Sequence, residues 1–114
     1  MKAVGAAAVV IALLGVAGCD SANNATVRDV AQRFIEAPTC ALLAPRARDS
    51  ATCSSLPPLP RAPVGSVSSW GDEAQARTDR DVLFLHEFPS GWLITGAGCR
   101  PRNDQVYDCA VGGP

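Results

Sequence analysis

The placement of five cysteines constrains this chain of 114 residues more than any other feature. Cys19 stands at the end of an apolar stretch, whereas Cys40, Cys53, Cys99 and Cys109 are spread over the rest of the chain. In an oxidising compartment an odd cysteine is left over for another purpose, and the other four can pair. A segment of about 100 residues forms one small domain, which two disulfides would help to stabilise.

The first 18 residues have the layout of a secretory signal peptide. Lys2 gives a positive start, and a run of small and apolar residues follows from Ala3 to Gly18. With sixteen residues, this run is shorter than the roughly 20 that a membrane-spanning helix needs. We therefore expect residues 1–18 to be removed on export.

The residues around the cleavage point, Val16-Ala17-Gly18-Cys19, resemble the lipobox of bacterial lipoproteins. In that family the cysteine thiol receives a diacylglyceryl group before cleavage, a thioether-forming step that needs a nucleophilic thiolate. At about 0.8 kcal/mol per buried methylene, two or three acyl chains hold a protein durably on a membrane. The resemblance implies lipid attachment at Cys19 and a location on the extracytoplasmic face of the cell membrane. The alternative is that Cys19 is an ordinary small residue of the signal.

Residues 19–25 are expected to form a lipidated tether, and residues 26–114 a single α+β domain. Apolar residues recur with helical spacing and predict an amphipathic helix that starts with Thr26 as its N-cap and ends before Pro38. They are Val27, Val30, Ala31, Phe34 and Ile35. A second, short helical piece is expected from Thr39, bent or restarted at Pro45. Four prolines between residues 56 and 63 predict an extended connector.

The remaining chain is typical of antiparallel strands. Alternating and apolar stretches separated by turn residues predict strands at 64–70, 73–78, 82–88, 92–99 and 105–111. A three-residue turn centred on Ser90 would pair Phe88 with Trp92, His86 with Ile94, and Phe84 with Gly96. The other side of that hairpin would then carry Leu83, Leu85 and Ala97.

Four cysteines allow three disulfide pairings, of which we favour Cys40–Cys53 with Cys99–Cys109. Centring the last hairpin on Asp104 places Cys99 directly opposite Cys109, at a separation that a disulfide can span. A redox or metal site is the alternative. It is disfavoured because the sequence has no CxxC motif and one histidine, His86. We expect no metal and no cofactor.

Composition excludes several classes of function. After removal of residues 1–18, nine arginines stand against eleven acidic residues, a net charge of −2, which provides no basic footprint for nucleic acid. That part of the chain contains no lysine, which rules out a P-loop, a Schiff base or a lysine-assisted nucleophile. The GxSxG, HExxH and GxGxxG motifs are also missing. No catalytic residue can be assigned, and an enzyme is the less favoured interpretation.

A ligand pocket can still be drawn around the single histidine. On the predicted aromatic side of its strand, His86 could line a pocket together with Trp70, Trp92 and Tyr107. The alternative is a histidine at the edge of a sheet that packs under a helix. The partners expected are the membrane, through the lipid, and an unknown envelope protein or small ligand.

Two helices followed by a curved antiparallel sheet of four to five strands resemble the cystatin-like or NTF2-like α+β cone. The order of Cys53 and the segments 40–45, 70–74, 83–85, 91–92, 97–101 and 107–109 is similar to that in small uncharacterised lipoproteins of actinobacteria. Neither resemblance implies an activity, because the cone fold hosts enzymes and binding modules alike. We expect a non-catalytic binding or interaction module of the cell envelope. The alternative is a small cone-fold enzyme, or a carrier of a small hydrophobic ligand, with a pocket near His86.

Overall fold

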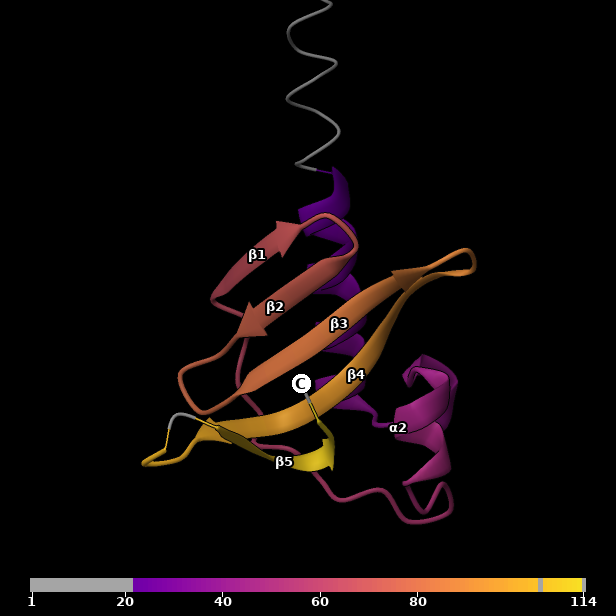
Figure 1. The fold of residues 1–114 in the computed structure, drawn as a ribbon, viewed down its shortest axis with the longest axis vertical. Coiled ribbons are helices and arrows are strands. Elements are labelled where there is room, and N and C mark those ends of the chain that lie inside the picture. Colours follow the sequence, from indigo (N-terminus) through magenta and orange to yellow (C-terminus); the bar gives the residue numbers. More distant parts are fainter. Residues whose placement is uncertain (1–21, 105, 114) are drawn as a thin grey trace, which may run out of the picture.

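A five-stranded antiparallel sheet with a helix across one of its faces forms the framework of the molecule, shown as a computed structural model in Figure 1. The structure describes residues 22–104 and 106–113. Cys19, the expected signal peptide and residues 20–21 lie outside the described residues. The α+β class, with a helix on an antiparallel sheet and two disulfides, is confirmed.

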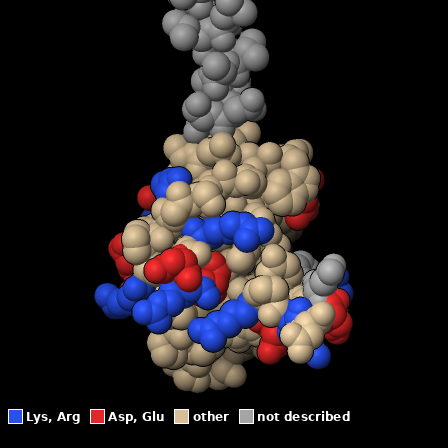
Figure 2. Space-filling model, turned by 90° about the vertical axis from the view of Figure 1, so that its left-hand side faces the viewer, with Lys and Arg blue, Asp and Glu red and all other residues tan. Residues whose placement is uncertain are grey.

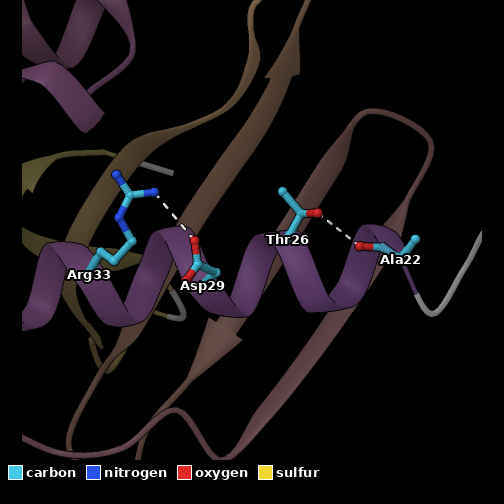
Figure 3. A network of polar contacts seen from close by, with 4 residues as sticks. All are labelled: Ala22, Thr26, Asp29 and Arg33. Carbon is cyan, nitrogen blue, oxygen red and sulfur yellow. Dashed lines mark hydrogen bonds and ion pairs between the residues drawn. The ribbon is translucent and has the colours of Figure 1, made fainter.

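The first helix includes residues 22–36 and buries the predicted apolar face. Each of the five residues of that face is at most 7% exposed, and Phe34 is completely buried. The prediction of Thr26 as N-cap is wrong, because residues 22–25 are already helical. A threonine hydroxyl can instead bond to the carbonyl one turn earlier, and Thr26 Oγ1 donates to the Ala22 oxygen at 2.9 Å (Figure 3). The helix thus extends into the segment that we expected to be a tether.

Asp29 lies on the exposed face of the first helix. Its carboxylate pairs one turn further on with Arg33, at 3.3 Å, on the exposed face of the helix (Figure 3). Both side chains are about 60% exposed, so this ion pair contributes little to stability, about 0.3–0.5 kcal/mol. The helix is therefore held by its buried face.

Two short helices follow, as the sequence predicts. The 3-10 helix η1 (Cys40–Leu42) begins after Thr39, whose hydroxyl accepts a hydrogen bond from the Ala41 amide at 3.3 Å. The helix α2 (Pro45–Asp49) has a proline at its first position, where no amide hydrogen is required. Between them the Ala44 amide donates to the Ile94 oxygen at 2.7 Å. This bond attaches the start of α2 to the sheet.

The proline-containing connector has neither helix nor strand between residues 56 and 65, in agreement with the prediction. Its end is tied to the first helix through the backbone of Val64. The Val64 amide donates to Gln32 Oε1 at 2.9 Å, and its carbonyl accepts from Arg28. Two side chains on the polar side of the helix therefore fix where the chain enters the sheet.

All five predicted strands are present, and each pairs with its neighbour in the sequence. They are β1 (Ser66–Trp70), β2 (Glu73–Arg77), β3 (Val82–Phe88), β4 (Gly91–Pro101) and β5 (Tyr107–Gly112). The longest, β4, extends beyond both of its predicted ends. Its extra residues pair with β3 at one end and with β5 at the other.

The predicted register between β3 and β4 is wrong near the turn. The connection has two residues rather than three, so Phe88 pairs with Gly91, Glu87 with Trp92, and Leu85 with Ile94. Gly91 has φ +123°, a conformation that glycine adopts readily. An irregularity around Thr95 then restores the predicted pairing of Phe84 with Gly96. The correction moves Trp92 and Ile94 to the opposite face of the sheet from His86.

The last hairpin has the predicted register, with Cys99 opposite Cys109 and Arg100 opposite Asp108. Cys99 and Cys109 form a disulfide with their Cα atoms 3.9 Å apart. Cys40 and Cys53 form the other, with Cα atoms 5.6 Å apart. Both favoured pairings are confirmed.

The hydrophobic core fills the space between the first helix and the sheet. Leu83, Leu85 and Ile94 point into it and are completely buried, and Trp92 is 5% exposed there. The opposite face of the sheet, which we call the open face, carries Phe84 and His86 and is only partly covered. The two faces of one sheet thus have different surroundings.

Candidate functional site

A groove of about 450 Å³ lies between α2 and the open face of the sheet. One wall consists of residues 44–47 and Ser50. The sheet contributes Glu73, His86, Phe88 and Thr95, and the end of the chain contributes Gly112 and Gly113. Ligand sites for small molecules usually have volumes of this order, roughly 300–1,000 Å³.

The alternation of β3 explains why these sheet residues face the groove. Leu83 and Leu85 occupy the core, so the side chains of His86 and Phe88, offset by one and three residues from Leu85, lie on the other face. Glu73 is the direct neighbour of His86 across the β2–β3 pair. The groove therefore receives one acid, one imidazole and one aromatic ring from two adjacent strands.

The imidazole of His86 lies between two carboxylates. Its Nδ1 contacts Glu73 Oε2, and its Nε2 is 3.7 Å from Asp72 Oδ2. The ring also packs edge-on against Phe88, with centroids 4.7 Å apart. With 30% of its side chain exposed, His86 is held in place by these neighbours while remaining accessible from the groove.

These three polar side chains are the one group of potential metal ligands among the described residues, with ligand atoms within 4.8 Å of one another. The side chains of Asp72 and Glu73 are 65% and 48% exposed. Each of them already pairs with His86, which accounts for their closeness without a metal ion. The cluster is therefore best described as a histidine oriented by two acids.

The opposite wall has a different character. Ala44 and Ala47 are buried alanines that leave space above the sheet, and Arg46 extends from the exposed side of α2. The groove is thus lined by one cationic residue from α2, Arg46, and one acid from the sheet, Glu73. An occupant of the groove would meet apolar surface in the middle and opposite charges on the two sides.

The rim of the groove depends on a close approach of the chain end to β4. The Gly113 amide donates to the Thr95 oxygen at 3.1 Å, and a Cβ atom at Gly112 would lie 2.2 Å from that same oxygen. Gly112 also has φ +61°. Glycine is therefore required here both for space and for backbone conformation.

Only one of the four residues predicted to line a pocket is in the groove. His86 lines it, whereas Trp92 belongs to the core on the other face because of the shorter turn. Trp70 is 55% exposed at the end of β1, and Tyr107 packs against Phe84 with ring centroids 5.0 Å apart. The sequence therefore identified the histidine but not its surroundings.

The α2 wall was missed by sequence reasoning. A short helix was expected here from Thr39 and Pro45, but the contact between residue 44 and Ile94 joins segments fifty residues apart. Such pairings have no local signal in the sequence. Phe88 could have been assigned to the groove from its spacing to His86, because alternate residues of a strand share a face.

Comparisons with known proteins provide no relative from which a function could be transferred. No family model matches the sequence, and no curated protein or solved structure is significantly similar to it. Among the described residues, no helix has both the length and the apolar character required to cross a bilayer.

Proposed function

We propose that this protein is a non-catalytic binding module, anchored by lipid at Cys19 to the extracytoplasmic face of a membrane, that takes a small ligand into the groove between α2 and the open face. The observation that carries the binding role is the groove itself, with His86 fixed between two acids on one wall. A rigid, partly apolar hollow with a few oriented polar groups is the usual form of a small-molecule site.

The two disulfides support a function that requires a fixed shape. Cys40–Cys53 closes the segment that contains α2, and Cys99–Cys109 joins the strands beside the groove rim. Both bonds require an oxidising compartment, in agreement with the export signal expected at residues 1–18. The lipid anchor is supported by the resemblance of residues 16–19 to a lipobox.

The chemistry of the walls indicates which ligand the groove would accept. Phe88 and the two buried alanines favour an apolar or aromatic body. Arg46 could pair with an anionic group, and Glu73 could pair with a cationic group. Small aromatic molecules with one charged group are therefore the expected class.

Benzoate and benzylamine are suitable probes of this site. Titrated into the isotope-labelled lipidated protein in detergent, either probe is expected to shift the NMR signals of His86, Thr95 and Gly113. Replacing Gly113, which lines the groove, with Phe should block part of it, and the change is accommodated because a Cβ atom there meets nothing within 4 Å. Gln75→Ala, on the same face but outside the groove, should leave the shifts unchanged. Shifts that survive in Gly113→Phe, or none with either probe, would argue against a binding groove.

The anchor is tested separately by mass spectrometry of the protein from bacterial envelopes. We expect loss of residues 1–18 and the added mass of a diacylglyceryl group on Cys19. The Cys19→Ser variant should retain its first residues and lack the lipid. An unmodified amino terminus in the parent protein would refute the anchor.

A small enzyme or hydrophobic-ligand carrier is the second candidate, and the contact between His86 and Glu73 favours it, because histidine–carboxylate pairs can transfer protons. Replacing His86 with Ala separates the two functions. If the variant folds and binds the probes as the parent protein does, binding does not depend on the group that a proton-transfer enzyme would use. That result would favour the binding module.

A further inference from the structure

Trp70 is the most exposed large hydrophobic residue of the described chain. It is the last residue of β1 and is 55% exposed. Trp92, in contrast, is 5% exposed. An indole ring has a large apolar surface and one polar N–H group, which makes tryptophan common at the boundary between lipid and water.

The position of Trp70 relates it to the start of the described chain. The hydroxyl of Ser69, its neighbour, donates to Asn24 Oδ1 at 2.6 Å, a contact between residues 45 positions apart. Figure 1 shows the end of β1 beside the beginning of the first helix. The exposed indole and the first described residues therefore lie at the same end of the domain.

Chain length limits how far this end can be from the proposed lipid. Cys19 and Ala22 are three residues apart, a span of at most about 11 Å in any conformation. The headgroup layer on each side of a bilayer is roughly 5–8 Å thick. A lipid on Cys19 would therefore hold the start of the first helix at or just outside the membrane surface.

The surface at this end is suited to such a contact. The first four described residues, 22–25, are uncharged, as are Ser68 and Ser69. The acids that follow Trp70, Asp72 and Glu73, lie beside His86 on the open face. Figure 2 shows that the atoms next to the grey segment are mostly neutral, whereas most charged side chains gather farther along the domain. Neutral polar groups can approach lipid headgroups without the cost of removing water from a charge.

We infer that this end of the domain, formed by residues 22–25 and 68–70, docks against the membrane surface with the indole of Trp70 in the headgroup layer. This inference rests on the proposed lipid anchor at Cys19. Lipid and indole together form a two-point attachment, which fixes the orientation of the domain and leaves the turn between β4 and β5 pointing away from the bilayer.

Tryptophan fluorescence tests the inference, because the two tryptophans differ in exposure. The lipidated Trp92→Phe variant, whose only indole is Trp70, is reconstituted into phosphatidylcholine vesicles with and without bromine on the upper acyl chain. We expect its emission to shift to shorter wavelength in vesicles and to be strongly quenched by the brominated lipid. The matched Trp70→Phe variant should show little quenching, since Trp92 is enclosed by protein.

A third variant provides an exposed reference. Val106 is 54% exposed in the turn between β4 and β5, at the other end of the sheet (Figure 1). Val106→Trp, in a chain with both native tryptophans changed to Phe, should remain unquenched. If the brominated lipid quenched this reference variant and the Trp92→Phe variant equally, with lipid confirmed by mass, the docked orientation would be overturned and the anchor left intact. Absence of the lipid would overturn the anchor, and the inference with it.

Discussion

The two faces of the sheet are built from alternate residues of the same strands but have different physical roles. The face under the first helix is closed and dry, with Phe34, Leu85 and Ile94 completely inaccessible to water. The open face carries Phe84, His86 and Phe88, none of which is fully buried. One face provides most of the hydrophobic stabilisation, and the other leaves its side chains partly accessible to solvent.

This difference shows why a small domain can maintain a groove at all. Burial of apolar surface on one side stabilises the fold by about 25 cal/mol per Å², and disulfides add further stabilisation. The open face does not have to be filled to keep the protein folded. Its acids and its histidine can therefore be placed for a ligand rather than for packing.

A pair of leucines on opposite faces gives the largest expected contrast. Leu85 is completely buried, whereas Leu93 lies on the open face opposite His86 and is partly exposed. Leu85→Ala should lower the free energy of unfolding by about 2–5 kcal/mol, because it leaves a cavity. Leu93→Ala should cost about 1 kcal/mol or less, since its methyl groups are partly in water already.

Urea unfolding followed by circular dichroism measures both losses. The slope of the free energy against urea should be the same in the two variants and the parent protein, which shows that the same surface is exposed. If Leu93→Ala were as destabilising as Leu85→Ala, the open face would belong to the core and the distinction between the faces would fail.

The two disulfides give the next contrast, which concerns the groove rather than the core. Their loops of 13 and 10 residues each correspond to about 3 kcal/mol in the chain-entropy model. Only Cys40–Cys53 encloses α2, which forms one wall of the groove. Replacing this pair with Ala should loosen the wall, whereas replacing Cys99 and Cys109 should leave it unchanged.

Hydrogen exchange distinguishes the two effects. The amides of Ala44 and Arg48 should exchange faster in the variant without Cys40 and Cys53, because their bonds to Ile94 and Ala44 hold the wall in place. The variant without Cys99 and Cys109 is less stable overall. Once this loss of global stability is taken into account, these amides should exchange in that variant as they do in the parent protein. Equal acceleration in both variants would mean that α2 does not depend on its own cross-link.

Local patterns in the sequence were sufficient for part of the closed face. The spacing of Val27, Phe34 and their neighbours identified the buried side of the helix, and the alternation of β3 placed Leu83 and Leu85 together on one side of the sheet. Centring the last hairpin on Asp104 gave its correct register, with Cys99 opposite Cys109. In each case the relevant interaction is local or is set by a turn of definite length.

The open face was less predictable, because it depends on details of turns and on distant contacts. A one-residue error in the turn at Ser90 moved Trp92 to the wrong side, since neighbouring residues of a strand face opposite ways. The groove also requires α2 to lie beside β4, through a contact between residues 44 and 94. The sequence contains no local indication of this pairing, and so the groove could not be anticipated.

Two glycines with the same backbone angle provide the smallest but most specific contrast. Gly112 at the groove rim and Gly71 in the β1–β2 turn have φ +61° and +60°, so alanine is strained at both, by about 1–2 kcal/mol. A Cβ atom at Gly71 meets nothing within 4 Å, whereas at Gly112 it would lie 2.2 Å from the Thr95 oxygen. Gly112→Ala should therefore destabilise the protein more than Gly71→Ala. It should also break the hydrogen bond from the Gly113 amide to the Thr95 oxygen, which would be measured as faster hydrogen exchange of that amide. Equal losses of stability would show that the chain end can move aside freely, and that the rim of the groove is not held by this close approach.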